Sequence, residues 1–269
     1  MKSIQTRAAV WKIGGLFGIL LLSGMLSLTM PRTVTAQTAT DATPSPTPLP
    51  QTICQAAADD QALLVIGPLN EPAPADASLG VSASALQARQ IQDALVASRA
   101  ANAVCQLILP INSRSEARTL LDQYNAIMIV YPTVEDFVRR LNVVLASANR
   151  KIDPAKLPNQ RLTLDIDEFE VAVRSVNDGL YAVQFLSGVL ATYRGQFERA
   201  QTLLVTAIEA VDINDPDVTL LGLDTAYAFL GFVRNALLDT PGSVAAFSLA
   251  IQINPTFINN YINRGKVQM

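Results

Sequence analysis

The sequence predicts an α/β plus all-α protein, in which a small α/β sandwich with a mainly parallel sheet precedes a superhelix of helical hairpins. In the first half, three continuous apolar runs alternate with helical patterns, which is typical of buried parallel strands. In the second half, small residues recur at a fixed period: Gly231 and Gly265 lie 34 residues apart. A period near 34 indicates paired helices that bury their apolar faces by stacking on their neighbours.

Composition excludes several classes of function. The chain has 269 residues, 50% hydrophobic and 16% charged, so it can bury a sizeable core. Its net charge of −3 argues against a basic face for nucleic acid. It contains no histidine, which removes the commonest general base and the commonest zinc ligand. We therefore expect no enzyme, no cofactor and no metal.

The first 36 residues have the pattern of a signal peptide. Basic residues precede an uncharged run from Ile13 to Met30, and small residues occupy the −3 and −1 positions of a cut before Gln37. The run is just long enough to cross a bilayer, so an uncleaved membrane anchor over 1–36 is the alternative. In either case we expect an exported chain that is secreted, periplasmic or on the cell surface. Residues 37–52, rich in Pro and Thr, are predicted to be a solvated linker.

Residues 53–160 are predicted to form the α/β domain. Buried strands are expected at Leu63–Ile66, Cys105–Leu109 and Ala126–Tyr131, with helices at 82–103 and from Ser113, which caps with Glu116. Residues 137–145 also fit a helix, but we interpret them as an edge strand. Residues 147–160 should connect the domains.

The helical part is assigned to 161–269. Asp165 followed by Glu168 is interpreted as a capping box that opens a helix near Ile166. The same residues, with Asp167 and Glu170, could form a paired-carboxylate or calcium site. Their place at a helix start favours the cap, because carboxylates stabilise the positive end of the helix dipole. Asp212–Asp217 has some likeness to a calcium loop, but it lacks the Gly and terminal Glu and is interpreted as a turn.

The later helices carry small and large residues at recurring slots. The units are about 181–214 and 224–257, with a partial unit from 258, and nine extra residues separate the first two. The slot residues are Gly188, Gly195, Ala200, Ala207, Tyr227, Leu230, Gly231, Phe247, Ala250, Pro255, Tyr261 and Gly265. On these residues the region resembles the tetratricopeptide repeat (TPR) family. Gln184, Ser187 and Ser243 depart from the family pattern.

The TPR resemblance implies a concave groove for a protein or peptide partner. Carried over slot by slot, the groove-facing residues are Ala182, Phe185, Val189, Thr192, Tyr193, Thr225, Ala228, Phe232 and Asn235. This lining is apolar and neutral, so we expect an extended or helical apolar segment as ligand. The alternative is that Phe185, Val189 and Phe232 only pack against a capping helix.

Cys54 and Cys105 are the only cysteines. They lie near the starts of the first two predicted strands, and neighbouring parallel strands start at the same edge of a sheet, so the two can meet. A disulfide there would stabilise an exported protein by about 4 kcal/mol on the chain-entropy model. Two buried thiols are the alternative.

The α/β part loosely resembles the amino-terminal domain of the Tol-system β-propeller family, on its layout and on residues 113–131. That resemblance implies cell-envelope assembly as one function. A small-molecule-sensing domain is another, with its ligand at the sheet edge near Gly67, Ser113 and Tyr131 and the repeats as an oligomerisation arm. The main prediction is an exported, non-enzymatic scaffold. We also expect the half-unit before Met269 either to cap the array or to be followed by further repeats.

Overall fold

The computed structural model describes residues 54–58, 62–68, 90–91, 93–99, 101–135, 138–153, 157, 162–212 and 218–269. The chain separates into Met1–Thr47 and Pro48–Met269, and every described residue belongs to the second unit. The predicted signal peptide and nearly all of the linker belong to the first unit. Both therefore lie outside the described residues.

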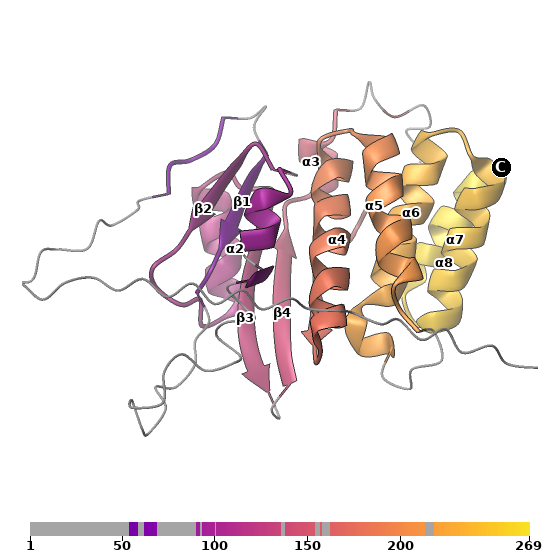
Figure 1. The fold of residues 1–269 in the computed structure, drawn as a ribbon. Coiled ribbons are helices and arrows are strands. Elements are labelled where there is room, and N and C mark those ends of the chain that lie inside the picture. The colour runs from indigo at the N-terminus through magenta and orange to yellow at the C-terminus, as the bar shows by residue number, and fades with distance from the viewer. Residues whose placement is uncertain are drawn as a thin grey trace, which may run out of the picture. The chain divides into compact units, whose positions relative to one another are not determined.

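A five-stranded mixed sheet forms the first part of this unit (Figure 1). Its strands are β1 (Leu63–Ile66), β2 (Ala103–Gln106), β3 (Met128–Glu135), β4 (Val138–Leu145) and β5 (Glu168–Val173), in the order β2-β1-β3-β4-β5. β1 pairs in parallel with β2 and β3, whereas β4 pairs antiparallel with β3 and β5. The parallel pairing of three strands agrees with the prediction. The second strand does not match its predicted bounds of Cys105–Leu109, because β2 ends at Gln106 and Ile108 and Leu109 are exposed. β4 and β5 correct the prediction to a mixed sheet. Only two residues join β3 to β4, which is enough for a hairpin but too few for a parallel crossover.

β4 is a strand, as expected, but it is not at the edge of the sheet. β5 pairs along its other side, with Leu141 opposite Val171. The polar and apolar residues that alternate at the start of Glu168–Val173 (EFEVAV) favour an extended stretch. Val171 and Val173 are buried on one face, and Glu168 and Glu170 project from the other. The sheet therefore continues past the predicted domain boundary at residue 160.

The helix predicted near Ile166 begins ten residues later, at Val176. Its capping box is formed by Ser175 and Asp178, not by Asp165 and Glu168. The Ser175 hydroxyl accepts from the Asp178 backbone N–H at 3.2 Å, and the Asp178 carboxylate accepts from the Ser175 backbone N–H at 3.0 Å.

The helix α2 (Arg114–Gln123) covers one face of the sheet. Ser113 caps it as predicted, because the Ser113 hydroxyl accepts from the Glu116 N–H at 3.1 Å. Beneath it a small core includes Ala117, Leu121 and Ile129. Cys54 and Cys105 belong to the same core and form a disulfide with Cα atoms 5.6 Å apart.

Five helices follow one another beside the sheet (Figure 1). They are α4 (Val176–Tyr193), α5 (Phe197–Glu209), α6 (Leu223–Ala236), α7 (Thr240–Ile253) and α8 (Ile258–Gln268); the helix α3 (Ala148–Lys151) and the 3₁₀ turn η3 (Val218–Leu221) are shorter. Connections of three or four residues make α4–α5, α6–α7 and α7–α8 antiparallel hairpins. An α/β part followed by a helical array is therefore the observed layout.

Helix pairs approach each other closely at the predicted glycine slots. A Cβ added at Gly188 would lie 2.8 Å from the Leu204 side chain, and one at Gly231 would lie 2.9 Å from the Phe247 ring. The predicted small residues opposite, Ala200, Ala207 and Ala250, have no exposed surface, and Leu230 is also buried. Gly195 lies in the turn between α4 and α5 with a φ of 65°, a conformation that glycine adopts without strain.

The sheet and the helices share one hydrophobic core. Phe169 of β5 stacks on Phe185 of α4 with ring centroids 5.1 Å apart, and Phe229 of α6 meets Phe185 edge-on at 6.4 Å. Such pairs add about 0.5–1.5 kcal/mol each beyond the area they bury. The array is thus built onto the sheet.

Tyr193 joins the end of α4 to the sheet. Its hydroxyl donates a 2.7 Å hydrogen bond to the carbonyl of Ala146, just after β4. Burial, with a smaller effect of the Asp167 charge, raises the pKa of Tyr193 well above its ordinary value. Burial raises the pKa of Tyr181 in the same way.

We expect stability to fall in alkali. Folded tyrosines of raised pKa hold their protons more tightly than the unfolded chain does, so their contribution is complete below the unfolded pKa of about 10 and is lost as pH rises through the folded values. Tyr193→Phe should cost about 1 kcal/mol near neutral pH and make the alkaline fall shallower. Urea unfolding from about pH 7 to 11 measures both. Equal slopes for the two proteins would show that Tyr193 does not contribute.

Candidate protein-binding face

The residues predicted to line a groove lie on one side of α4 and α6. We call this side, together with the adjoining side of α8, the inner face. The predicted groove residues are Phe185, Val189, Thr192 and Tyr193 on α4, and Thr225, Ala228, Phe232 and Asn235 on α6. All are buried except Thr225, which is half-buried, and Ala182 is buried as well. The chain itself therefore fills the space in which an open groove was expected.

The sheet covers the part of the inner face that belongs to α4. Phe185 packs against Phe169 of β5, and Tyr193 donates to the carbonyl after β4. Phe185 is therefore covered by a strand, and not by the capping helix that was the alternative. No pattern in α4 itself could have shown this, because the contact joins segments that are distant in the chain.

An extended segment, residues 162–167, lies against α8. Its alternate residues Leu162, Leu164 and Ile166 are buried in the core shared with α4 and α6, while the residues between them are half-buried or exposed. Asn263 of α8 holds the segment by its backbone. The Asn263 amide donates 2.9 Å to the Thr163 carbonyl and accepts from the Thr163 N–H at 3.4 Å.

A second asparagine of α8 continues this contact. The Asn259 amide donates to the Asp165 carbonyl at 3.4 Å. Asn259 and Asn263 are one helical turn apart, a rise of about 6 Å, and alternate residues of an extended chain are about 6.6 Å apart. The spacing of the two asparagines therefore matches successive backbone groups on one edge of an extended peptide. Backbone bonds fix its path and the apolar side chains determine what fits, as in other modes of peptide recognition.

No site was predicted from the sequence at Asn259, Asn263 or residues 162–167. The available signal was the period of two in Leu162, Leu164 and Ile166, which is typical of a half-buried extended segment. The Asp165–Glu168 pattern instead led to the prediction of a helix near Ile166, so the extended segment was missed.

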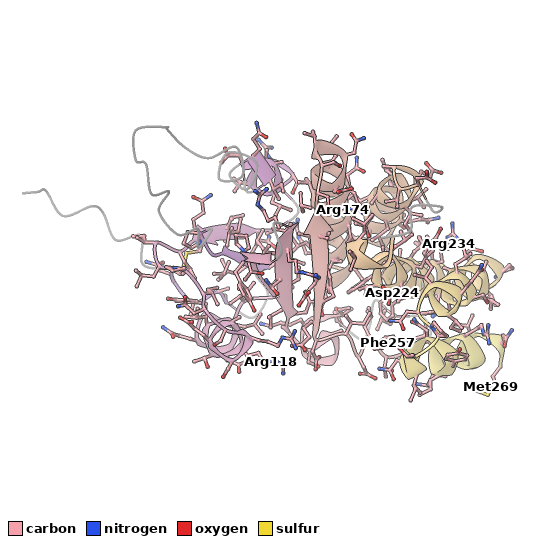
Figure 2. All side chains as sticks on the ribbon, turned by 90° about the horizontal axis from the view of Figure 1, so that it is seen from below. Arg118, Arg174, Asp224, Arg234, Phe257 and Met269 are labelled. Carbon is pink, nitrogen blue, oxygen red and sulfur yellow. A yellow bond between two sulfur atoms is a disulfide. The ribbon has the colours of Figure 1, made fainter. Side chains whose placement is uncertain are left out.

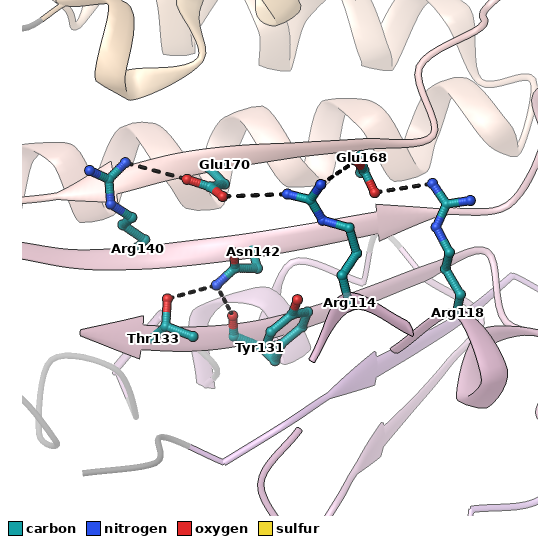
Figure 3. A network of polar contacts seen from close by, with 8 residues as sticks. All are labelled: Arg114, Arg118, Tyr131, Thr133, Arg140, Asn142, Glu168 and Glu170. Atoms are coloured by element: carbon teal, nitrogen blue, oxygen red, sulfur yellow. Dashed lines mark hydrogen bonds and ion pairs between the residues drawn. The ribbon is translucent and has the colours of Figure 1, made fainter. Parts of the chain in front are cut away.

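The four acidic residues considered as a site are divided between two places. Glu168 and Glu170 project from β5 into a chain of ion pairs with three arginines (Figure 3). Arg118 and Arg114 reach Glu168 from α2 at 3.0 and 2.7 Å, and Arg114 and Arg140 reach Glu170 at 3.7 and 3.3 Å. These partly exposed pairs join α2 to β5 and contribute about 0–1 kcal/mol each. Within the described residues, no group of three or more Cys, Asp or Glu side chains is arranged to hold a metal ion.

Asp165 and Asp167 border two pockets at one end of the sheet. A pocket of about 400 Å³ lies between α2 and the array, where Arg118, Asp224 and Phe257 form its walls (labelled in Figure 2). A pocket of about 450 Å³ adjoins it and shares Arg118 and Asp167. Neither includes the edge proposed for a small ligand, where Ser113 caps α2 and Tyr131 is buried. The geometry there favours structural roles for both residues.

The chain matches no family model, and no curated protein or solved structure is significantly similar to it. None of the helices in the described ranges is long and apolar enough to cross a membrane.

Proposed function

We propose that this chain is an exported, non-enzymatic scaffold of the TPR type, which binds an extended apolar segment of a partner protein on its inner face. One observation carries the proposal: the inner face already holds such a segment, residues 162–167 of the chain itself. The asparagine contacts and the alternating buried side chains are the features that a partner segment would use. The close helix approach at Gly188 and Gly231 supports a TPR-type superhelix.

In this proposal residues 162–167 compete with the partner. The segment is held to α8 by the side-chain bonds of Asn259 and Asn263, and hydrogen bonds of this kind contribute about 0.5–1.5 kcal/mol each. A partner whose apolar residues alternate in the same way would replace it. The apparent affinity of the partner would then equal its intrinsic affinity multiplied by the fraction of molecules in which the segment is undocked.

Export is supported by the disulfide of Cys54 and Cys105, because disulfides persist in oxidising compartments. The basic and apolar start of the chain supports the same location.

The binding proposal is tested with a fluorescein-labelled peptide of residues 161–168. We expect weak binding to the unchanged chain, because its own segment occupies the face. The variant Leu162→Ser/Leu164→Ser weakens that occupation and should bind the peptide about tenfold more tightly or better. Fluorescence anisotropy gives both affinities, and circular dichroism shows whether the variant is folded.

The matched control adds Asn263→Ala to the same variant, which should lose the gain because the backbone contacts are gone. The single variant Asn263→Ala leaves Leu162 and Leu164 in the core unchanged, so it tests the asparagine contact by itself. In hydrogen exchange, the Thr163 amide of this variant should exchange faster, and the amides within α6 should not. Equal peptide binding by all the chains, or an unchanged Thr163 amide, contradicts the proposal.

A further inference from the structure

The helix α8 has asparagines at two positions where the earlier helices of the array have apolar residues. These positions lie five and two residues before the slot glycine of each helix. Their occupants are Val183 and Leu186 in α4, Ala226 and Phe229 in α6, and Asn260 and Asn263 in α8. Both asparagines are buried. Because buried amides need hydrogen-bond partners, each of them requires a physical explanation.

The segment at 162–167 explains Asn263 but not Asn260. The Asn263 amide donates to the Thr163 carbonyl at 2.9 Å. Asn260 is only 1% exposed, and its side-chain nitrogen meets no hydrogen-bond acceptor in the part of the chain that the structure describes. An unpaired buried donor destabilises a fold, and the alanine at the equivalent position of α6 avoids that cost.

The helical spacing directs Asn260 into the inner face. Val267 follows it by seven residues, or two turns, so the two side chains lie along one line of α8. Val267 is buried in the core that the apolar residues of the segment share with α4 and α6. Asn260 therefore presents an unpaired amide to this otherwise apolar core.

The contacts of the neighbouring asparagines identify the segment position at the level of Asn260. Asn263 and Asn259 bond to the backbone at positions 163 and 165. Asn260 lies between these two asparagines along α8, and position 164 lies between their partners along the segment. Leu164 occupies that position, and its buried side chain has no atom that can accept a hydrogen bond. The chain's own segment therefore leaves the amide unsatisfied.

We infer that Asn260 is a specificity-determining residue of the inner face, which selects a partner segment with a carboxamide or hydroxyl side chain in place of Leu164. Such a side chain accepts a hydrogen bond from the buried amide, which the chain's own segment cannot do. The tethered segment has the advantage of a high effective concentration, and this extra bond helps the partner to displace it. The inference rests on the proposed function, because it names the chemistry of the partner at the same face.

The first test compares two fluorescein-labelled peptides of residues 161–168, one unchanged and one with Leu164→Asn, which keeps a side chain of similar size. The receptor is the chain with Leu162→Ala/Leu164→Ala, which weakens the docking of its own segment without adding a hydrogen-bonding group. We expect the Leu164→Asn peptide to bind at least as tightly as the unchanged peptide, although it buries less apolar surface. Adding Asn260→Leu to the receptor should shift the ratio of the two affinities about tenfold or more towards the unchanged peptide.

Asn259→Leu in the same receptor is the matched control, because it is the same substitution one residue away on α8. It should weaken both peptides by removing a bond to the backbone, and the ratio of their affinities should stay the same. A ratio that Asn260→Leu does not change overturns the inference and leaves the proposed function standing. If neither peptide binds any receptor, the proposed function fails and the inference fails with it.

Urea unfolding of the chain with its own segment intact tests Asn260 without a peptide. Asn260→Leu should raise the midpoint, because it removes the unpaired amide. Leu164→Asn should lower the midpoint less in the chain that has Asn260 than in the Asn260→Leu chain. A lower midpoint for Asn260→Leu, or equal losses from Leu164→Asn in the two chains, overturns the inference even if the peptides bind.

Discussion

Gly231→Leu is expected to lower the free energy of unfolding by about 3 kcal/mol. A Cβ alone at this position would approach two carbons of the Phe247 ring at 2.9 Å. The ring is 1% exposed and has no free space to move into. The Ser243 hydroxyl also donates a 2.7 Å hydrogen bond to the Gly231 carbonyl, which fixes the distance between α6 and α7. Urea midpoints of the variant and the unchanged chain measure the loss.

The same substitution at Gly265 is the control. Both glycines lie within helices and in the same predicted slot, but Gly265 has open space beside it. Gly265→Leu should be neutral or stabilising by up to about 1 kcal/mol, because leucine is the better helix former. Equal changes at the two positions would mean that the contact with Phe247 does not decide the outcome, and the assigned repeat phase would be wrong.

The structure also limits the side chains that α6 can accept at its repeat positions more than the repeat period does. Asn235 was predicted to face an open groove, but its side chain is buried. The clearance at Gly231 is likewise smaller than the period alone suggests, since alanine already meets the Phe247 ring. A repeat period identifies which residues face each other, but the separation of the helices depends on the particular side chains between them.

The predictable features were those with local signals. Continuous apolar runs identified β1 and β3, the Ser113–Glu116 pattern identified the start of α2, and Gly188 and Gly231 identified the helix contacts. These succeeded because burial, capping and close packing each leave a pattern within a few residues or one period.

The features that were wrong or missed had ambiguous local signals or depend on contacts distant in sequence. Asp165–Glu168 and Ser175–Asp178 have similar cap patterns, and only the alternation in β5 distinguishes them. Phe185 packs against Phe169 of β5, and Val189 belongs to the same core as the segment at 162–167, which no periodicity in α4 reports. A groove inferred from repeat slots is therefore a statement about which side of a helix is apolar, and not about whether that side is open.

Removing the disulfide is expected to have the other large effect. Cys54 and Cys105 are 51 residues apart, and both belong to the core beneath α2. On the chain-entropy model the bond restricts the unfolded chain and stabilises the fold by about 4 kcal/mol. Cys54→Ala/Cys105→Ala should lose most of this while keeping two small apolar side chains in the core. Urea unfolding measures the loss.

The source of the effect can be separated from a packing defect. If the bond acts through the unfolded chain, the double variant exposes more surface on unfolding, so its m-value should rise as its midpoint falls. A lower midpoint with an unchanged m-value would instead indicate damage to the core around Ala117 and Leu121. Mass spectrometry tests the pairing itself: alkylation of the unfolded, unreduced chain should add nothing. Two added groups would show free thiols, and the predicted loss of stability would then have no cause.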